Sequence, residues 1–122
     1  MAKILVVDDE LDVLESVKML IETMGYEIKT IDNGKGAIKL LEKEKFDLVI
    51  LDILMPKMTG IETLEKIRAN QKLKKQKVAF LSVVSLSKNG KGVIKKLNPV
   101  AYIEKPIENI PFKKKLKKIL GS

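Results

Sequence analysis

The sequence predicts an α/β protein in which a parallel sheet of five strands is covered by helices on both faces. Short runs rich in Val, Ile and Leu alternate with segments whose apolar residues recur at helical spacing. The runs are apolar at consecutive positions, as expected of strands in a parallel sheet that is buried on both faces. The 122 residues, 45% of them apolar, suffice for one sizeable core. We therefore expect a single domain over residues 1–122.

Five segments are predicted to be strands because each is short, apolar and rich in β-branched residues. They are KILVVD (3–8), YEIKTI (26–31), FDLVIL (46–51), VAFLSV (78–83) and VAYIEK (100–105). Since crossovers between parallel strands are right-handed, few topologies remain, and the flavodoxin-like order 2-1-3-4-5 is the common one for five strands. In such sheets ligands bind at the carboxyl ends of the strands.

The segments between the strands carry apolar residues at the spacing of helices that pack on a sheet. These residues are Leu14, Val17, Leu20, Ile21 and Met24 in the first segment, Ala37, Ile38, Leu40 and Leu41 in the second, and Ile61, Leu64 and Ile67 in the third. Gly25 is expected to end the first helix, and Asn33 or Gly34 to begin the second. Gly90 and Gly92 disfavour a helix, so the fourth helix is expected to begin late or to fray.

Composition excludes several classes of site. The chain has no Cys and no His, which excludes disulfides, thiolate or imidazole metal ligands, and Cys or His catalysts. No apolar run approaches the roughly 20 residues of a membrane span, and acidic residues follow the N-terminus too soon for a secretory leader. We expect a cytoplasmic protein whose chemistry uses carboxylates, hydroxyls and lysines.

Polar residues stand at the ends of four predicted strands. They are Asp8 and Asp9 at the end of the first strand, Asp52 at the end of the third, Ser82 at the end of the fourth and Lys105 at the end of the fifth. Because the carboxyl ends of parallel strands meet at one edge, we expect a single site. Three carboxylates at such range repel one another unless a divalent cation neutralises them. Oxygen ligands without His or Cys suit Mg²⁺ or Mn²⁺.

Each of these residues also has a purely structural interpretation. Asp8 or Asp9 could cap the first helix, Ser82 could be an ordinary strand-end hydroxyl, and Lys105 could be a solvated loop charge. Their joint placement at four strand ends favours the site over four separate coincidences.

Four stretches, in chain order, resemble the signatures of the receiver domain of two-component response regulators. They are VVDDE (6–10), LVILDILMPKMTG (48–60), FLS (80–82) and YIEKP (102–106). The resemblance covers essentially the whole chain. It implies that Asp52 accepts a phosphoryl group, in a Mg²⁺-dependent reaction, from a phosphohistidine on a histidine kinase or a phosphotransfer protein.

The resemblance also implies a set of metal ligands. Asp9 would bind Mg²⁺ directly together with Asp52, Asp8 would bind mainly through water, and the main-chain carbonyl of Leu54 would be the third protein ligand. A carboxylate at the end of a buried strand would then be tolerated because the metal and Lys105 balance its charge.

A conformational switch is the third implication of the resemblance. Ser82 would hydrogen-bond a phosphoryl oxygen, and Tyr102 would turn inward behind it. The face formed by the fourth helix, the fifth strand and the last helix would change and signal to a separate effector protein, as in chemotaxis-type or phosphorelay regulators that carry no output domain.

Two positions depart from the commonest pattern of the family. Leu54 lies two residues after Asp52, and Val84 lies two residues after Ser82, where many relatives that lose phosphate quickly carry polar side chains. Apolar side chains cannot orient a water molecule. We therefore expect slow loss of the phosphoryl group.

Other functions are disfavoured by particular residues. The net charge of +8 and the cluster KKKLKK (113–118) raise the alternative of binding nucleic acid or an acidic partner, but Leu116, Ile119 and Leu120 supply a core face and few aromatics exist to stack on bases. A phosphatase of the haloacid dehalogenase type needs an acid where Leu54 stands. A dinucleotide-binding protein needs a glycine-rich loop after the first strand, which is absent.

Overall fold

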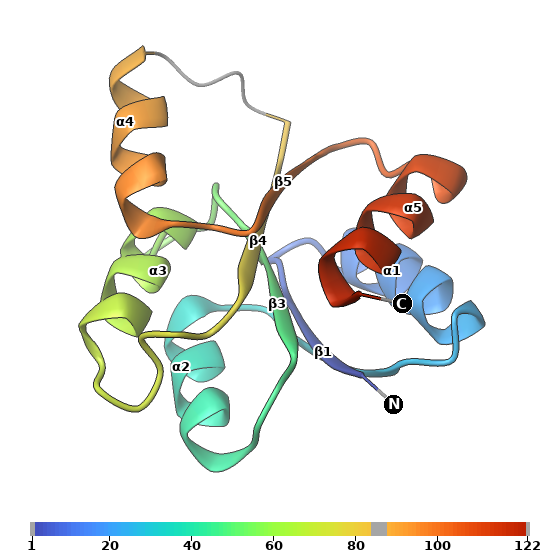
Figure 1. The fold of residues 1–122 in the computed structure, drawn as a ribbon, viewed down its shortest axis with the longest axis horizontal. Helices are drawn as coiled ribbons and strands as arrows, with labels where there is room; N and C mark the ends of the chain where they lie inside the picture. The colour runs from blue at the N-terminus through green and yellow to red at the C-terminus, as the bar shows by residue number, and fades with distance from the viewer. Residues whose placement is uncertain (1, 84–87, 122) are drawn as a thin grey trace.

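The protein folds as a three-layer α/β sandwich, seen in Figure 1 in a computed structural model that describes residues 2–83 and 88–121. The elements are β1 (Lys3–Val7), α1 (Leu11–Thr23), β2 (Glu27–Ile31), α2 (Gly34–Lys43), β3 (Leu48–Asp52), α3 (Gly60–Ala69), β4 (Val78–Ser82), α4 (Lys88–Leu97), β5 (Ala101–Glu104) and α5 (Asn109–Leu120). All strand pairs are parallel, and the strand order is β2-β1-β3-β4-β5. The predicted fold class and strand order are confirmed.

Each face of the sheet buries its own hydrophobic cluster. Helices α2, α3 and α4 cover one face through Ala37, Leu41, Leu64, Ile67 and Ile94, which pack on Leu5, Val7, Val49, Leu51, Val78 and Phe80. Helices α1 and α5 cover the other face through Leu14, Val17, Ile21, Phe112 and Leu116, which pack on Ile4, Val6, Leu48, Ile50, Ala79, Leu81 and Ile103. The predicted helices on both faces of the sheet are therefore present, as Figure 1 shows.

Local sequence signals set the ends of the first three helices. Gly25, with a φ of 82°, follows the C-terminal end of α1 as predicted. Asn33 is the N-cap of α2, and its side chain accepts a hydrogen bond of 2.6 Å from the main-chain N–H of Gly36. Thr59 and Glu62 form a reciprocal capping box at the start of α3.

The fourth helix begins at Lys88 and contains both Gly90 and Gly92. The expectation of a late start falls partly on residues 84–87, outside the described residues, and fraying stays a prediction.

Within the described ranges, no helix has the length and apolarity needed to cross a membrane.

Arg68, the single arginine among 24 Lys and Arg residues, ties α3 to the C-terminal end of α4. Its guanidinium donates to the main-chain carbonyls of Leu97 (2.7 Å), Gln76 (2.7 Å), Lys74 (3.0 Å) and Asn98 (3.2 Å). Burial lowers the pKa of this guanidinium. A planar group with five fixed donors can serve four carbonyls at once, which an ammonium cannot do with the same geometry.

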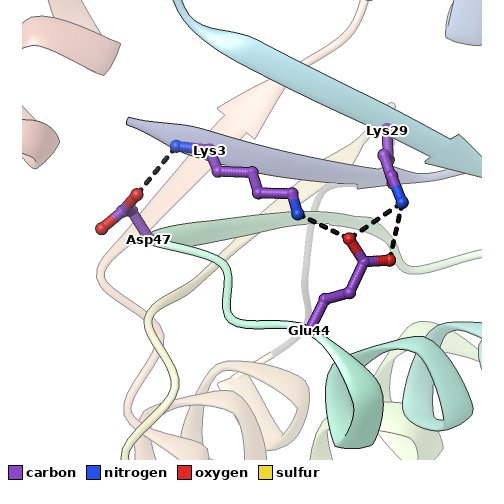
Figure 2. Close-up of polar contacts among 4 residues, drawn as sticks. All are labelled: Lys3, Lys29, Glu44 and Asp47. Carbon is purple, nitrogen blue, oxygen red and sulfur yellow. Dashed lines mark hydrogen bonds and ion pairs between the residues drawn. The ribbon is translucent and has the colours of Figure 1, made fainter. Parts of the chain in front are cut away.

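A separate set of polar contacts lies near the amino-terminal end of β1, away from the carboxyl ends of the strands (Figure 2). The main-chain N–H of Lys3 donates to Asp47 at 2.7 Å, and Glu44 accepts from the ammonium groups of both Lys3 and Lys29. The hydrogen bonds from Lys29 and Lys3 hold the pKa of Glu44 below its usual value. These contacts join β1 and β2 to the connection between α2 and β3.

Candidate functional site

The predicted acids and the lysine converge where the strands end. Asp8 follows β1, Asp52 is the last residue of β3, and Lys105 follows β5. The Nζ atom of Lys105 lies 2.8 Å from Oδ2 of Asp8 and 3.7 Å from Oδ2 of Asp52. Asp8 and Asp52 are buried, with 0% and 3% of their surface exposed, so their charges face one another with little screening by solvent.

A third carboxylate completes the acidic cluster. One oxygen each from Asp8, Asp9 and Asp52 lies within 4.8 Å of the other two. Asp9 is exposed, unlike its two neighbours, so the cluster is accessible from the side of Asp9. The arrangement supplies hard oxygen donors at a solvent-accessible position, which suits a divalent cation.

Helix capping does not explain these acids. The N-cap of α1 is Glu10, which makes no side-chain capping bond. Asp8 instead uses Oδ1 to accept a hydrogen bond of 2.9 Å from the main-chain N–H of Glu10. Its Oδ2 atom is buried and lies 2.8 Å from the Lys105 ammonium, which is its cationic partner. Both oxygens of Asp8 therefore have partners outside the first turn of the helix.

Burial, and after it the charge of Asp8, raises the pKa of Asp52 from 3.8 to about 7. Lys105 and the main-chain N–H of Leu54, which donates to Oδ1 of Asp52 at 3.3 Å, act in the opposite direction. Asp52 is therefore partly protonated near neutral pH when no further positive charge is present. A carboxylate must be ionised to act as a nucleophile, so additional positive charge at this edge would activate it.

Lys105 is held by three carboxylates. Burial on its own would lower the pKa of its ammonium, but the contacts with Asp8, Asp52 and Glu10 raise it above the usual value. Glu10 Oε1 lies 3.3 Å from the Lys105 Nζ atom. Sequence reasoning assigned Glu10 no role, although it belongs to the stretch VVDDE and directly follows the two acids.

Ser82 and Tyr102 occupy neighbouring strands on one face of the sheet. Ser82 is the buried last residue of β4 and follows Leu81, which pairs with Asp52. Tyr102 of β5 pairs with Phe80, two residues before Ser82. Because side chains alternate between faces, Phe80, Ser82 and Tyr102 share the face covered by α2, α3 and α4. The roles assigned to Ser82 and Tyr102 stay predictions.

Of the two apolar residues predicted to flank the site, Leu54 lies within the described part of the chain. Leu54 has 56% of its surface exposed and lies two residues beyond Asp52. Its side chain therefore stands beside the site in solvent and brings no acid to it, contrary to what the phosphatase alternative needs. Val84 lies outside the described residues.

The lysines of α5 lie on a helix whose apolar side is used for packing. Phe112 and Leu116 are buried, and Ile119 and Leu120 are partly buried against the same cluster. The predicted core face of the last helix is confirmed. Phe112 is the single aromatic residue of α5, so this helix offers no exposed ring on which a base could stack.

A family model described as the response regulator receiver domain matches residues 4–117. Among curated proteins, the CpxR homolog of Haemophilus influenzae is 38% identical over 93 residues, which are 76% of this chain and 37% of the relative. The transcriptional regulatory protein PhoP of Bacillus subtilis is 44% identical over 71 residues, 58% of this chain and 29% of the relative. The chain thus spans well under half the length of both relatives.

Solved structures agree in fold over the whole chain. Chemotaxis protein CheY4 of Vibrio cholerae is 30% identical, with a TM-score of 0.90 and coverage of 98% of this chain and 99% of that one. Response regulator protein TrrA of Thermotoga maritima, solved in complex with Mg²⁺ and BeF, is 35% identical, with a TM-score of 0.83 and coverage of 98% and 100%.

Proposed function

Because this chain belongs to the response regulator receiver domain family, we propose that Asp52 accepts a phosphoryl group from a phosphohistidine on a histidine kinase or a phosphotransfer protein. Receiver domains are phosphoacceptor modules of two-component signalling. One observation carries the assignment to Asp52: it is the buried last residue of a central strand, and the Lys105 ammonium lies 3.7 Å from its carboxylate. That a separate effector protein reads the result belongs to the same proposal.

The residues of the site fit a divalent cation, Mg²⁺ or alternatively Mn²⁺. Three carboxylates gather within 4.8 Å, and the single positive charge of Lys105 beside Asp8 and Asp52 does not balance all three of them. Asp9, Asp52 and the main-chain carbonyl of Leu54 would hold the cation, with Asp8 beside them. When bound, the cation would neutralise charge on the acids and on the anionic donor.

The chain's own residues account for the rest of the reaction. A carboxylate oxygen of Asp52 forms a bond to phosphorus while the bond from phosphorus to the donor nitrogen breaks, and the electron pair of the broken bond stays on the donor. Lys105 would stabilise the charge on the phosphoryl oxygens. Burial of Asp52 limits access of water to the acyl phosphate that results.

The signal would leave the site through Ser82 and Tyr102. A hydrogen bond from Ser82 to a phosphoryl oxygen would alter the space next to the Ser82 side chain. Tyr102 lies beside that space: it is on β5, two positions before the residue that pairs with Ser82, and on the same face of the sheet. Lys115 of α5 donates to the main-chain carbonyl of Tyr102 at 2.6 Å. A change at Tyr102 would therefore reach the face formed by α4, β5 and α5.

Intact-mass measurement after incubation with acetyl phosphate and Mg²⁺ tests the phosphoacceptor. The wild type should gain one phosphoryl group, and Asp52→Asn should gain none. Asp32→Asn is the matched control, because Asp32 also follows a strand, β2, and is exposed; it should react like the wild type. A full phosphoryl adduct on Asp52→Asn would overturn the assignment.

A Mg²⁺ titration followed by NMR or by tyrosine fluorescence tests the metal ligands. Asp9→Ala should weaken Mg²⁺ binding by about tenfold or more, since it removes one of the proposed carboxylate ligands. Asp12→Asn, which changes an exposed acid in the first turn of α1, should bind nearly as the wild type does. Equal affinities in the wild type and in Asp9→Ala would contradict the proposed site.

A further inference from the structure

We propose that Glu10 is a positioning residue for Lys105, which it draws away from Asp52 until a phosphoryl group arrives. The inference rests on the proposed function of Asp52. It adds Glu10 to a site that so far consists of the three clustered aspartates, Ser82 and Lys105.

The resting position of the lysine carries the inference. The Lys105 Nζ atom lies 2.8 Å from Asp8, 3.3 Å from Glu10 and 3.7 Å from Asp52. The ammonium is thus nearer to both acids of the connection between β1 and α1 than to the phosphoacceptor. A lysine side chain is a flexible stem that carries a point charge, so competing carboxylates decide where its ammonium rests.

Glu10 differs from the other two acids in exposure. The side chains of Asp8 and Asp52 are buried, whereas 63% of the Glu10 side chain is exposed. An ion pair with an exposed carboxylate is weak. Glu10 can therefore bias the position of the lysine without locking it, and release it when a stronger anion forms.

Two hydrogen bonds fix the main chain of Glu10 in the connection between β1 and α1. Its N–H donates to Oδ1 of Asp8 at 2.9 Å, and its carbonyl accepts from Leu14 at the start of α1. From this anchored position the Glu10 side chain reaches Lys105. The contact therefore joins the connection between β1 and α1 to the connection between β5 and α5.

Phosphorylation would reverse the competition. A phosphoryl group brings a charge of about −2 to Asp52, beside the ammonium. Lys105 would then leave Glu10 for the phosphoryl oxygens. The main-chain N–H of Lys105 donates to Ser82 O at 3.0 Å, so this transfer occurs next to the proposed switch residue. Glu10 accordingly favours the unphosphorylated state, and its removal should favour the other.

Binding of beryllofluoride, a mimic of the phosphoryl group, tests the inference when titrated at saturating Mg²⁺ and followed by NMR. Glu10→Gln removes the charge, and Glu10→Asp keeps the charge but shortens its reach. Both should bind beryllofluoride about two- to fivefold more tightly than the wild type, the range expected for loss of one exposed ion pair. Asp12→Asn, the control for nearby charge, should change the affinity by less than about 1.5-fold.

A double-mutant cycle separates action through Lys105 from general electrostatics. In a Lys105→Met background, Glu10→Gln should leave the residual affinity unchanged; a persisting gain would overturn the inference. So would a Glu10→Gln affinity equal to that of the wild type, or equal gains in Glu10→Gln and Asp12→Asn with none in Glu10→Asp. Failure of the wild type to bind beryllofluoride at all would instead overturn the proposed function of Asp52, and this inference with it.

Discussion

Gly60 lies directly against the main-chain carbonyl of Asp52. A Cβ atom at position 60 would stand 2.1 Å from that carbonyl oxygen and 2.8 Å from Cα of Ile53. The N–H of Gly60 also donates to Ile53 O at 2.8 Å. The first residue of α3 therefore packs directly against the segment that carries Asp52, the proposed phosphoacceptor, and a residue without a side chain is needed there.

We expect Gly60→Ala to impair both stability and phosphorylation. The added methyl group must displace main-chain atoms, because no flexible side chain is there to give way, at a cost of about 2 kcal/mol in the free energy of unfolding. The shift of Asp52 should slow its reaction with acetyl phosphate by about tenfold. Urea unfolding and an intact-mass time course measure the two effects.

Gly92→Ala is the matched control. Gly92 lies exposed inside α4, and among the described residues no atom beyond its chain neighbours and the backbone of its own helix stands within 4 Å of a Cβ built there. Alanine should raise the free energy of unfolding by about 0.5–1 kcal/mol through its higher helix propensity, with no effect on the phosphorylation rate. If Gly60→Ala behaved like Gly92→Ala, the contact with Asp52 would not constrain the site.

The fold and the gathering of Asp8, Asp52 and Lys105 were predictable from the sequence because they follow from general rules. Apolar runs separated by helical patterns imply a parallel sheet, and a parallel sheet brings its strand ends to one edge. Strand boundaries were less predictable. Phe46 precedes β3, which begins at Leu48, but is buried in the core like a strand residue. An apolar pattern reports burial and does not show which residues pair.

The roles of Glu10 and Arg68 could not be predicted in the same way. Glu10 contacts a lysine 95 positions away, and Arg68 contacts carbonyls up to 30 positions away. Such contacts depend on the reach of long side chains between elements, which spacing along the chain does not specify. The pKa of Asp52 likewise depends on burial and on Asp8, a neighbour from another strand end.

The raised pKa of Asp52 predicts a pH-dependent stability in the absence of metal. The folded state holds a proton on Asp52 up to a pH of about 7, whereas the unfolded state releases it near 3.8. Stability should therefore fall as the pH rises through this interval and level off above it. Asp52→Asn cannot ionise, so near pH 8 in EDTA it should be more stable than the wild type by about 2 to 4 kcal/mol.

Urea unfolding near pH 5 and near pH 8 measures this difference, which should be much smaller at the lower pH. Mg²⁺ should narrow the gap near pH 8, because a bound cation favours the ionised carboxylate. The same gap at both pH values, or no gap at either, would show that burial does not raise the pKa of Asp52.

Replacing the single arginine should loosen the attachment of α4. Arg68→Lys keeps the positive charge but cannot donate to four carbonyls at once, so two or more hydrogen bonds should be lost. We expect the free energy of unfolding to drop by about 2–3 kcal/mol, since the carbonyls of Leu97 and Gln76 would be left without this donor.

Lys66→Ala, which changes an exposed residue of the same helix, is the control for this comparison and should stay within about 0.5 kcal/mol of the wild type. Chemical denaturation supplies the energies, and hydrogen exchange at the C-terminal end of α4 should rise in Arg68→Lys alone. Unchanged exchange there would argue that other contacts hold the helix.

The last prediction concerns the lifetime of the phosphorylated state. Hydrolysis of an acyl phosphate needs a water molecule held in line with the phosphorus, and a flanking polar side chain can hydrogen-bond that water. Leu54, 56% exposed beside Asp52, can shield the phosphoryl group but cannot orient water. Val84, the second flanking residue, lies outside the described residues, so its contribution rests on sequence alone. Intrinsic dephosphorylation should therefore be slow.

Leu54→Asn tests this expectation first, because it places a hydrogen-bonding group of similar size next to Asp52. One well-placed hydrogen bond worth about 1.4 kcal/mol in the transition state gives a tenfold rate change, so decay should accelerate by roughly that factor. Adding Val84→Glu should accelerate it further, while Leu54→Met, apolar and of similar volume, should decay like the wild type. Phosphate release at one temperature supplies the rates; a wild type that decays as fast as the double variant would show that the apolar side chains do not protect the phosphoryl group.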